Sequence, residues 1–204
     1  MQHIGKTINS RIRGNGKGWC FTPNDFADLG SLSAVWTALH RLAQRGVIRR
    51  LGQGLYDFPR TDSELGLLSP DPEAIAKALA RGKGIRVQPS GAYAANLLGL
   101  SEQVPARVVF LTDGAPRRIR VGNQEIVLRR TTPRNMATAG RISGTVIQAL
   151  RYIGKDRITP AHRQILMHRL SVAEKQQVFK DRLNAPGWMR RVLEEISGEA
   201  GPNA

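Results

Sequence analysis

The sequence predicts an α+β protein with a small N-terminal domain of two helices and a hairpin, followed by a mixed α/β domain that ends in a helical segment. Apolar residues recur at helical spacing over residues 31–46, and two strand-like runs joined by a glycine-rich turn follow directly. A helical pattern returns from Pro160 to Ile196, broken at Ser171 and at Pro186-Gly187. The 204 residues suffice for two small domains. We expect these domains at residues 1–60 and 73–198, with a linker at 61–72 and a flexible tail at 199–204.

The N-terminal region begins with two predicted helices. Ile4, Ile8 and Ile12 recur at every fourth position, so we expect a helix over residues 4–13. The glycine-rich run at 14–18 ends it, because glycine favours turns. A short helix is then expected from Pro23 to Leu29, with Thr22 as its N-cap and proline at its first position.

The helix predicted from Ser31 to Arg45 is central to the interpretation. Ser31 or Ser33 can cap its start, and Gly46 can end it in a left-handed conformation. The apolar face is predicted to bury Leu32, Val35, Leu39 and Leu42. The opposite face is predicted to expose Ser33, Thr37, His40, Arg41 and Gln44. Trp36, on the flank, can cover the core, which we favour, or stack on a sugar or base.

A basic hairpin is predicted after this helix. Val47–Leu51 and Leu55–Phe58 have the composition of strands, and Gly52-Gln53-Gly54 joins them. Helix, turn, helix and basic hairpin is the order of a winged helix-turn-helix.

The exposed side chains of the central helix and hairpin have the chemistry of a DNA reader. Hydroxyl, amide and guanidinium groups hydrogen-bond base edges and phosphates, and the outer face of the helix carries no acid. An amphipathic solvated helix followed by an ordinary hairpin is the alternative. The predicted DNA-binding residues are Ser33, Thr37, His40, Arg41, Gln44, Arg49, Arg50 and Gln53.

The charge balance also indicates a polyanionic partner. There are 31 lysine and arginine residues against 16 acids, giving a formal charge of +15. A basic membrane-surface protein is the competing class. However, no apolar run reaches the roughly 20 residues of a membrane span, and the N-terminus lacks the apolar core of a signal peptide. We therefore expect a cytoplasmic protein without a membrane partner, in which the single Cys20 is a small core residue.

The second half reads as alternating helices and strands. We expect a helix near 72–81, a strand at 85–88, a buried strand at 108–112, a hairpin at 118–121 and 125–129, a loop at 131–139 and a helix at 140–153. The hairpin gathers arginines whose mutual repulsion costs stability unless a polyanion neutralises it. This possible second basic surface, for DNA or RNA, comprises Arg117, Arg118, Arg120, Arg129 and Arg130. An ordinary solvated hairpin is the open alternative.

Two segments resemble the AbiEi-type antitoxins of bacterial type IV toxin–antitoxin systems. Ser33 to Tyr56 resembles their DNA-binding domain, a likeness that many regulators share. The run from Pro89 to Leu100 (PSGAYAANLLGL), then Pro105 and the run from Val109 to Gly114 (VFLTDG), is similar to the core of their antitoxin domain and is more specific. The resemblance covers most of residues 1–155 and weakens after that.

The resemblance implies a protein with two roles. The N-terminal domain would bind double-stranded operator DNA with inverted repeats and repress its own operon. The C-terminal domain would counter a nucleotidyltransferase toxin without a stable complex. A stand-alone regulator with a ligand-sensing C-terminal domain and an RNA-binding protein are the alternatives.

The sequence contains no recognisable catalytic or metal-binding pattern. No histidine is tied by spacing to Ser90 or Asp113, and His162 and His168 are six residues apart, unlike a two-histidine metal face. A metal-dependent nuclease needs clustered carboxylates, which the 16 acids do not provide. We therefore expect no enzymatic activity, metal or cofactor.

Overall fold

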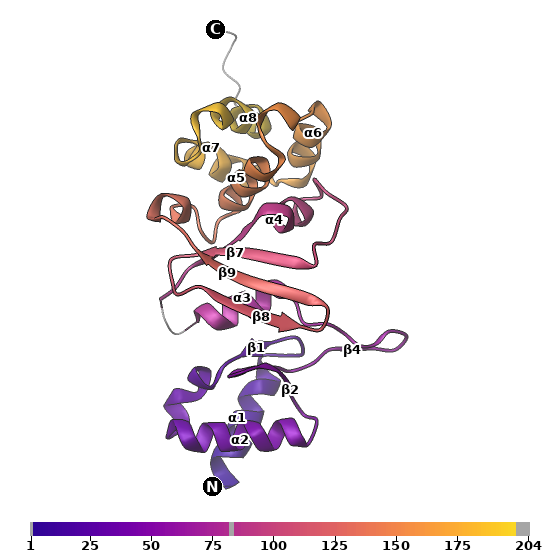
Figure 1. Cartoon of the computed structure of the whole chain (residues 1–204), viewed down its shortest axis with the longest axis vertical. Helices are drawn as coiled ribbons and strands as arrows, with labels where there is room; N and C mark the ends of the chain where they lie inside the picture. The colour runs from indigo at the N-terminus through magenta and orange to yellow at the C-terminus, as the bar shows by residue number, and fades with distance from the viewer. Residues whose placement is uncertain (1, 82–83, 199–204) are drawn as a thin grey trace. The chain divides into compact units, whose positions relative to one another are not determined.

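The computed structural model describes residues 2–81 and 84–198, a mixed α/β chain (Figure 1). The chain divides into two compact units. Unit 1 comprises the residues up to Ile85 together with Ile119–Ile126, and unit 2 comprises Arg86–Arg118 and the residues from Val127 onward. The predicted tail at 199–204 lies outside the described residues. Within the described ranges, no helix is both long enough and apolar enough to cross a membrane.

Unit 1 contains the elements predicted for residues 1–60, with one additional strand. The two predicted strands of the hairpin and the three predicted helices are present. In order, its first elements are α1 (Gln2–Gly14), β1 (Cys20–Phe21), η1 (Pro23–Leu29), α2 (Leu32–Gln44), β2 (Arg49–Gly52) and β3 (Leu55–Asp57).

The predicted helix boundaries of α2 and η1 follow from local capping. The Ala34 amide donates to Ser31 Oγ at 3.3 Å, so Ser31 is the N-cap of α2. Gly46, with φ +69°, follows its C-terminus and donates its amide to the Ala43 carbonyl. Thr22 caps η1, where the Asp25 carboxylate accepts the Thr22 amide at 2.7 Å. η1 is a tight 3₁₀ segment and not an α-helix.

The hairpin belongs to a three-stranded antiparallel sheet of order β1-β3-β2. Arg49 lies opposite Asp57, and Arg50 lies opposite Tyr56. Gly54 in the connecting turn has φ +66°, a conformation that favours glycine. The sequence analysis missed β1, because a two-residue strand leaves no alternating pattern to detect.

Aromatic rings fill the core between the sheet and the helices of unit 1. Phe21 packs edge-on against Phe26 and stacks on Tyr56. Trp36 meets Tyr56 edge-on and packs against this core, as we favoured from the sequence. Leu32 was wrongly predicted to be buried: it is 51% exposed, because it is the first residue of α2 and lies at the edge of the buried side formed by Val35, Ala38, Leu39 and Leu42.

The predicted linker at 61–72 contains two short antiparallel strands, β4 (Thr61–Asp62) and β5 (Gly66–Leu67). The helix predicted near 72–81 is present as α3 (Pro72–Ala80). α3 packs against β1 within unit 1. The boundary between the compact units therefore falls after α3, whereas the sequence analysis placed α3 at the start of the second domain.

Unit 2 combines most of a four-stranded sheet, in which β6 and β7 pair antiparallel, with a helical cluster (Figure 1). The four-stranded sheet has the order β6-β7-β9-β8. The elements of this half, in order, are β6 (Val87–Ser90), α4 (Gly91–Leu97), β7 (Arg107–Thr112), β8 (Arg117–Val121), β9 (Gln124–Arg130), η2 (Pro133–Met136), α5 (Ile142–Ile153), η3 (Lys155–Arg157), α6 (Pro160–Arg169), α7 (Val172–Asp181), η4 (Arg182–Asn184) and α8 (Gly187–Ser197).

The predicted buried strand, the predicted hairpin, and the helical breaks near Ser171 and Pro186 are confirmed. Two details differ. The strand expected at 85–88 is shifted to Val87–Ser90 and includes Pro89, which an edge strand such as β6 tolerates. The loop expected at 131–139 contains η2. α4 and α5 pack on each other, and their apolar residues share one core with α6, α7 and α8.

Candidate nucleic-acid interface

The two sides of α2 are chemically distinct. Val35, Ala38, Leu39 and Leu42 are buried in the core of unit 1. The five polar residues predicted to face outward are all exposed, and because they recur at helical spacing they form one stripe. This stripe, which we call the α2 face, comprises Ser33, Thr37, His40, Arg41 and Gln44. The helix contains no acidic residue.

The three residues predicted on the hairpin have different environments. Arg50 is exposed, and its Nε donates to the Gly52 carbonyl over a long 3.4 Å. Gln53 is exposed in the turn. Arg49 is engaged within the protein: Nε and Nη2 donate to the two carboxylate oxygens of Asp57 at 3.0 and 2.6 Å, and Nη2 also donates to the Leu68 carbonyl. Its geometry fits a structural ion pair better than a DNA contact.

The three carboxylates of residues 1–60 are all paired with arginines. Asp25 pairs with Arg81 at 2.9 Å, Asp28 with Arg11 at 2.7 Å, and Asp57 with Arg49 at 2.6 Å. The Arg11 guanidinium, through its hydrogen bond, lowers the pKa of the exposed Asp28 carboxyl. In the part of the chain that the structure describes, no carboxylate pairs with Arg41, Arg45 or Arg50. The negative charges of this region are thus held away from the α2 face.

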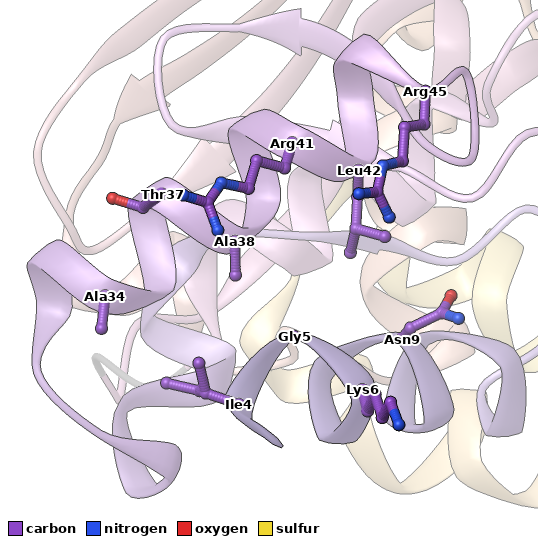
Figure 2. A pocket seen from close by; sticks show the side chains of 10 residues that line it. All are labelled: Ile4, Gly5, Lys6, Asn9, Ala34, Thr37, Ala38, Arg41, Leu42 and Arg45. Atoms are coloured by element: carbon purple, nitrogen blue, oxygen red, sulfur yellow. The ribbon is translucent and has the colours of Figure 1, made fainter. Parts of the chain in front are cut away.

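A groove of about 420 Å³ lies between α1 and α2 (Figure 2). Arg41 of α2 and Arg45, directly after α2, line it on one side, and Lys6 and Asn9 of α1 line it on the other. No acidic residue lines it. Asn9 Oδ1 is buried without a hydrogen-bond partner in the described structure. A groove that holds three cations and no acid can bind a phosphate.

Sequence reasoning missed Lys6, Asn9 and Arg45 as candidate site residues. A signal for the first two existed: Lys6 and Asn9 are three apart on α1, so they share a face beside the apolar Ile4-Ile8-Ile12 face. What the sequence did not provide was the packing of α1 against α2, which places that polar face beside Arg41.

The arginines of the predicted second basic surface are divided between the faces of their strands. Side chains alternate along a strand, so Arg118 and Arg120 on β8 share one face while Arg117 lies on the other. Arg129 and Arg130 are adjacent on β9 and point to opposite faces for the same reason. All but the half-buried Arg117 are exposed. One strand face cannot present all five together.

Comparison with known proteins gives one match. Residues 7–178 match the model of DUF6088, a family of unknown function. No curated protein matches the chain. No solved structure matches it either.

Proposed function

We propose that this chain, which belongs to the DUF6088 family of unknown function, is a DNA-binding repressor of its own operon. One observation carries the proposal: α2 exposes an acid-free stripe of hydroxyl, imidazole, guanidinium and amide groups, while its other side is anchored in the core. Such groups read base edges when a helix enters the major groove.

The surrounding elements support a winged helix-turn-helix. η1 and α2 are joined by a tight turn at Gly30-Ser31, and the β2–β3 hairpin follows α2 as a wing would. In this arrangement α2 is the recognition helix, Arg50 and Gln53 contact the backbone from the wing, and the α1–α2 groove receives a flanking phosphate. A repressor of this class binds inverted repeats as a pair of copies.

We infer the antitoxin role from the resemblance of the Pro89–Gly114 region to AbiEi-type antitoxins. The protein then acts in the cytoplasm, without catalysis, and opposes a nucleotidyltransferase toxin without a stable complex. Co-expression with the nucleotidyltransferase of a neighbouring gene tests this role. Growth arrest by that protein alone, relieved by this chain, is the expected result. Arrest that persists in its presence removes the antitoxin role and leaves the repressor.

The second candidate function is a stand-alone regulator whose C-terminal part senses a ligand. A polar pocket in unit 2, described below, favours it. A neighbouring gene without toxicity supports this candidate over the antitoxin. A magnesium-dependent cut in plasmid DNA, in place of a shift on a gel, would contradict both, because neither includes nuclease activity.

The repressor proposal is tested on DNA from immediately upstream of the gene, with random DNA as the competitor. Arg41→Ala and Gln44→Ala are expected to cost about 1–3 kcal/mol each in discrimination between the two DNAs. Arg190→Ala is the matched control, because Arg190 is an exposed helical arginine of unit 2. If both α2 variants discriminate like the wild type, the α2 face is not the reading surface.

A further inference from the structure

A second cavity, of about 210 Å³, lies within unit 2. It forms where β6 leads into α4 and where β9 and α5 end. The residues that give it its chemistry are Ser90, Arg129, Asn135, Gln148, Arg151 and Tyr152, and no acidic residue lines it. The proposed DNA-binding function does not use it.

Two guanidinium groups stand at this cavity. Arg151 Nη1 donates to Asn135 Oδ1 at 2.9 Å, and Asn135 Nδ2 in turn donates to Thr131 Oγ1 at 2.9 Å. This chain of bonds orients the Arg151 side chain and leaves most of its five N–H donors for a ligand. Arg129 is exposed, and in the described structure it forms no ion pair or hydrogen bond with protein. A pair of cations without a counter-charge fits an anionic ligand.

The buried end of the cavity supplies neutral polar groups. Ser90 and Gln148 are each only 4% exposed. The Ser90 hydroxyl donates to Gln148 Oε1 over a long 3.4 Å, and the Gln148 amide nitrogen donates to no acceptor among the described residues. Because Gln148 lines the cavity, its amide nitrogen can donate to a ligand oxygen there.

An aromatic ring stands at the rim. Tyr152 is 49% exposed and neighbours Arg151 on α5. Gly91 lies beside the ring, since a Cβ at residue 91 would be 4.0 Å from Tyr152 Cδ2. An exposed ring next to cations can stack on a nucleobase whose phosphate those cations hold.

We propose that this cavity binds one nucleoside monophosphate unit. The phosphate accepts hydrogen bonds from Arg129, Arg151 and the Gln148 amide, and the base stacks on Tyr152 at the rim. The volume of about 210 Å³ is below the roughly 300–1,000 Å³ of pockets that enclose a whole ligand of nucleotide size, so the cavity holds the phosphate and sugar and leaves the base at the rim. The unit can be a free nucleotide or the phosphorylated end of a single-stranded RNA, which present the same chemistry.

Calorimetric titration of the full chain tests the proposal with AMP, GMP, CMP, UMP, inorganic phosphate and adenosine. Nucleotides are expected to bind, and adenosine is not. Arg129→Gln and Arg151→Gln should each weaken nucleotide binding about tenfold or more, as expected for the loss of a charge-assisted hydrogen bond. Tyr152→Ala should weaken binding of nucleotides but leave binding of inorganic phosphate unchanged.

Arg130→Gln is the matched control, because Arg130 is the neighbouring exposed arginine on β9 but does not line the cavity. If Arg129→Gln and Arg130→Gln lose nucleotide affinity equally, the binding is general electrostatic attraction and the proposed site is wrong. Failure of every nucleotide to bind also overturns it. If a short RNA with a 5′ phosphate binds more tightly than the mononucleotides, the natural ligand is the end of an RNA strand. If the affinities are equal, the natural ligand is the free nucleotide. Operator binding by Arg151→Gln stays unchanged, which separates this site from the α2 face.

Discussion

Arg49 and Asp57 lie opposite each other on β2 and β3 and form a two-point ion pair, with N–O distances of 3.0 and 2.6 Å. The Asp57 side chain is 1% exposed and that of Arg49 is 25% exposed. Two parallel N–H···O bonds fix the geometry of both side chains. Arg49 therefore holds the base of the hairpin together, and its removal leaves a buried charge.

Replacing Arg49 with alanine should lower the stability of unit 1. Breaking a buried pair by removing one partner costs about 3–5 kcal/mol, so we expect a loss near the lower end for this partly exposed arginine. Chemical denaturation measures the free energy of unfolding. Arg50→Ala, on the adjacent exposed residue, should leave it unchanged while weakening DNA binding. Comparable stability of Arg49→Ala and wild type would show that the pair contributes nothing to the hairpin.

Neutralising the α1–α2 groove should change the salt dependence of DNA binding. Each lost phosphate contact reduces the slope of log affinity against log salt by about one, so Lys6→Gln and Arg45→Gln should each do so for operator and random DNA alike. Fluorescence anisotropy over a series of salt concentrations gives the slope. Lys180→Gln, an exposed lysine of α7, is the control. If neither Lys6→Gln nor Arg45→Gln changes the salt slope, the α1–α2 groove does not bind a DNA phosphate.

Cys20 should be unreactive in the folded protein. Burial raises the pKa of its thiol to about 12, with the nearby Asp57 charge adding to the shift. Since the thiolate is the reactive form, only about one thiol in 10,000 is ionised near pH 8. Alkylation followed by mass spectrometry should therefore proceed only as fast as the protein opens. Labelling at the rate of an unfolded control peptide would contradict the burial of Cys20.

Gly144 on α5 has no room for a side chain. A Cβ there would lie 2.5 Å from the Thr138 carbonyl oxygen and would also meet the Gln88 side chain. Because the first of these atoms belongs to the backbone, Gly144→Ala should destabilise the protein by about 1–3 kcal/mol. Gly187→Ala on α8 is the matched control, since a Cβ there meets nothing within 4 Å and the helix gains a better helix former. Thermal unfolding of the two variants makes the comparison. If the two changes have the same effect, the close approach at Gly144 is relaxed in solution.

The Asp113 carboxylate should stabilise the fold at neutral pH and not in acid. Its pKa is lowered by bonds from the Arg86 amide and guanidinium, both at 2.8 Å. A folded-state pKa below the unfolded value of about 3.9 gives stability that is complete above that value and is lost as the pH falls through the folded pKa. Asp113→Asn should therefore be less stable than wild type near pH 6 and should approach it near pH 3. Asp156→Asn, at an exposed carboxylate, is the control. A stability difference that does not change with pH would rule out this bond as its cause.

Helical spacing and cap residues were sufficient to predict α2, because both are local: Ser31 and Gly46 bound the helix, and Val35 to Leu42 give its buried side. The environment of Arg49 was not predictable in this way. Its partner Asp57 lies on another strand, and the pairing depends on the register of β2 with β3. The two cavities likewise depend on residues far apart in sequence, such as Ser90, Arg129 and Arg151, that come together only when β6, β9 and α5 pack. Periodicity indicates which way a side chain faces and not what it meets, which is also why Leu32 was misplaced.

The indole of Trp36 sets the spacing between α2 and the tip of the hairpin. A methyl group at Gly54 would lie 3.2 Å from Trp36 Cη2, so the ring acts as a fixed spacer beneath the turn. Under the proposed function, α2 and the hairpin both contact DNA. The side chain of Trp36 then fixes the distance between them without contacting a base itself. A smaller residue at position 36 would then change the distance between the groove contacts of α2 and the backbone contacts of the hairpin. Operator preference would change although no residue that contacts DNA had been replaced.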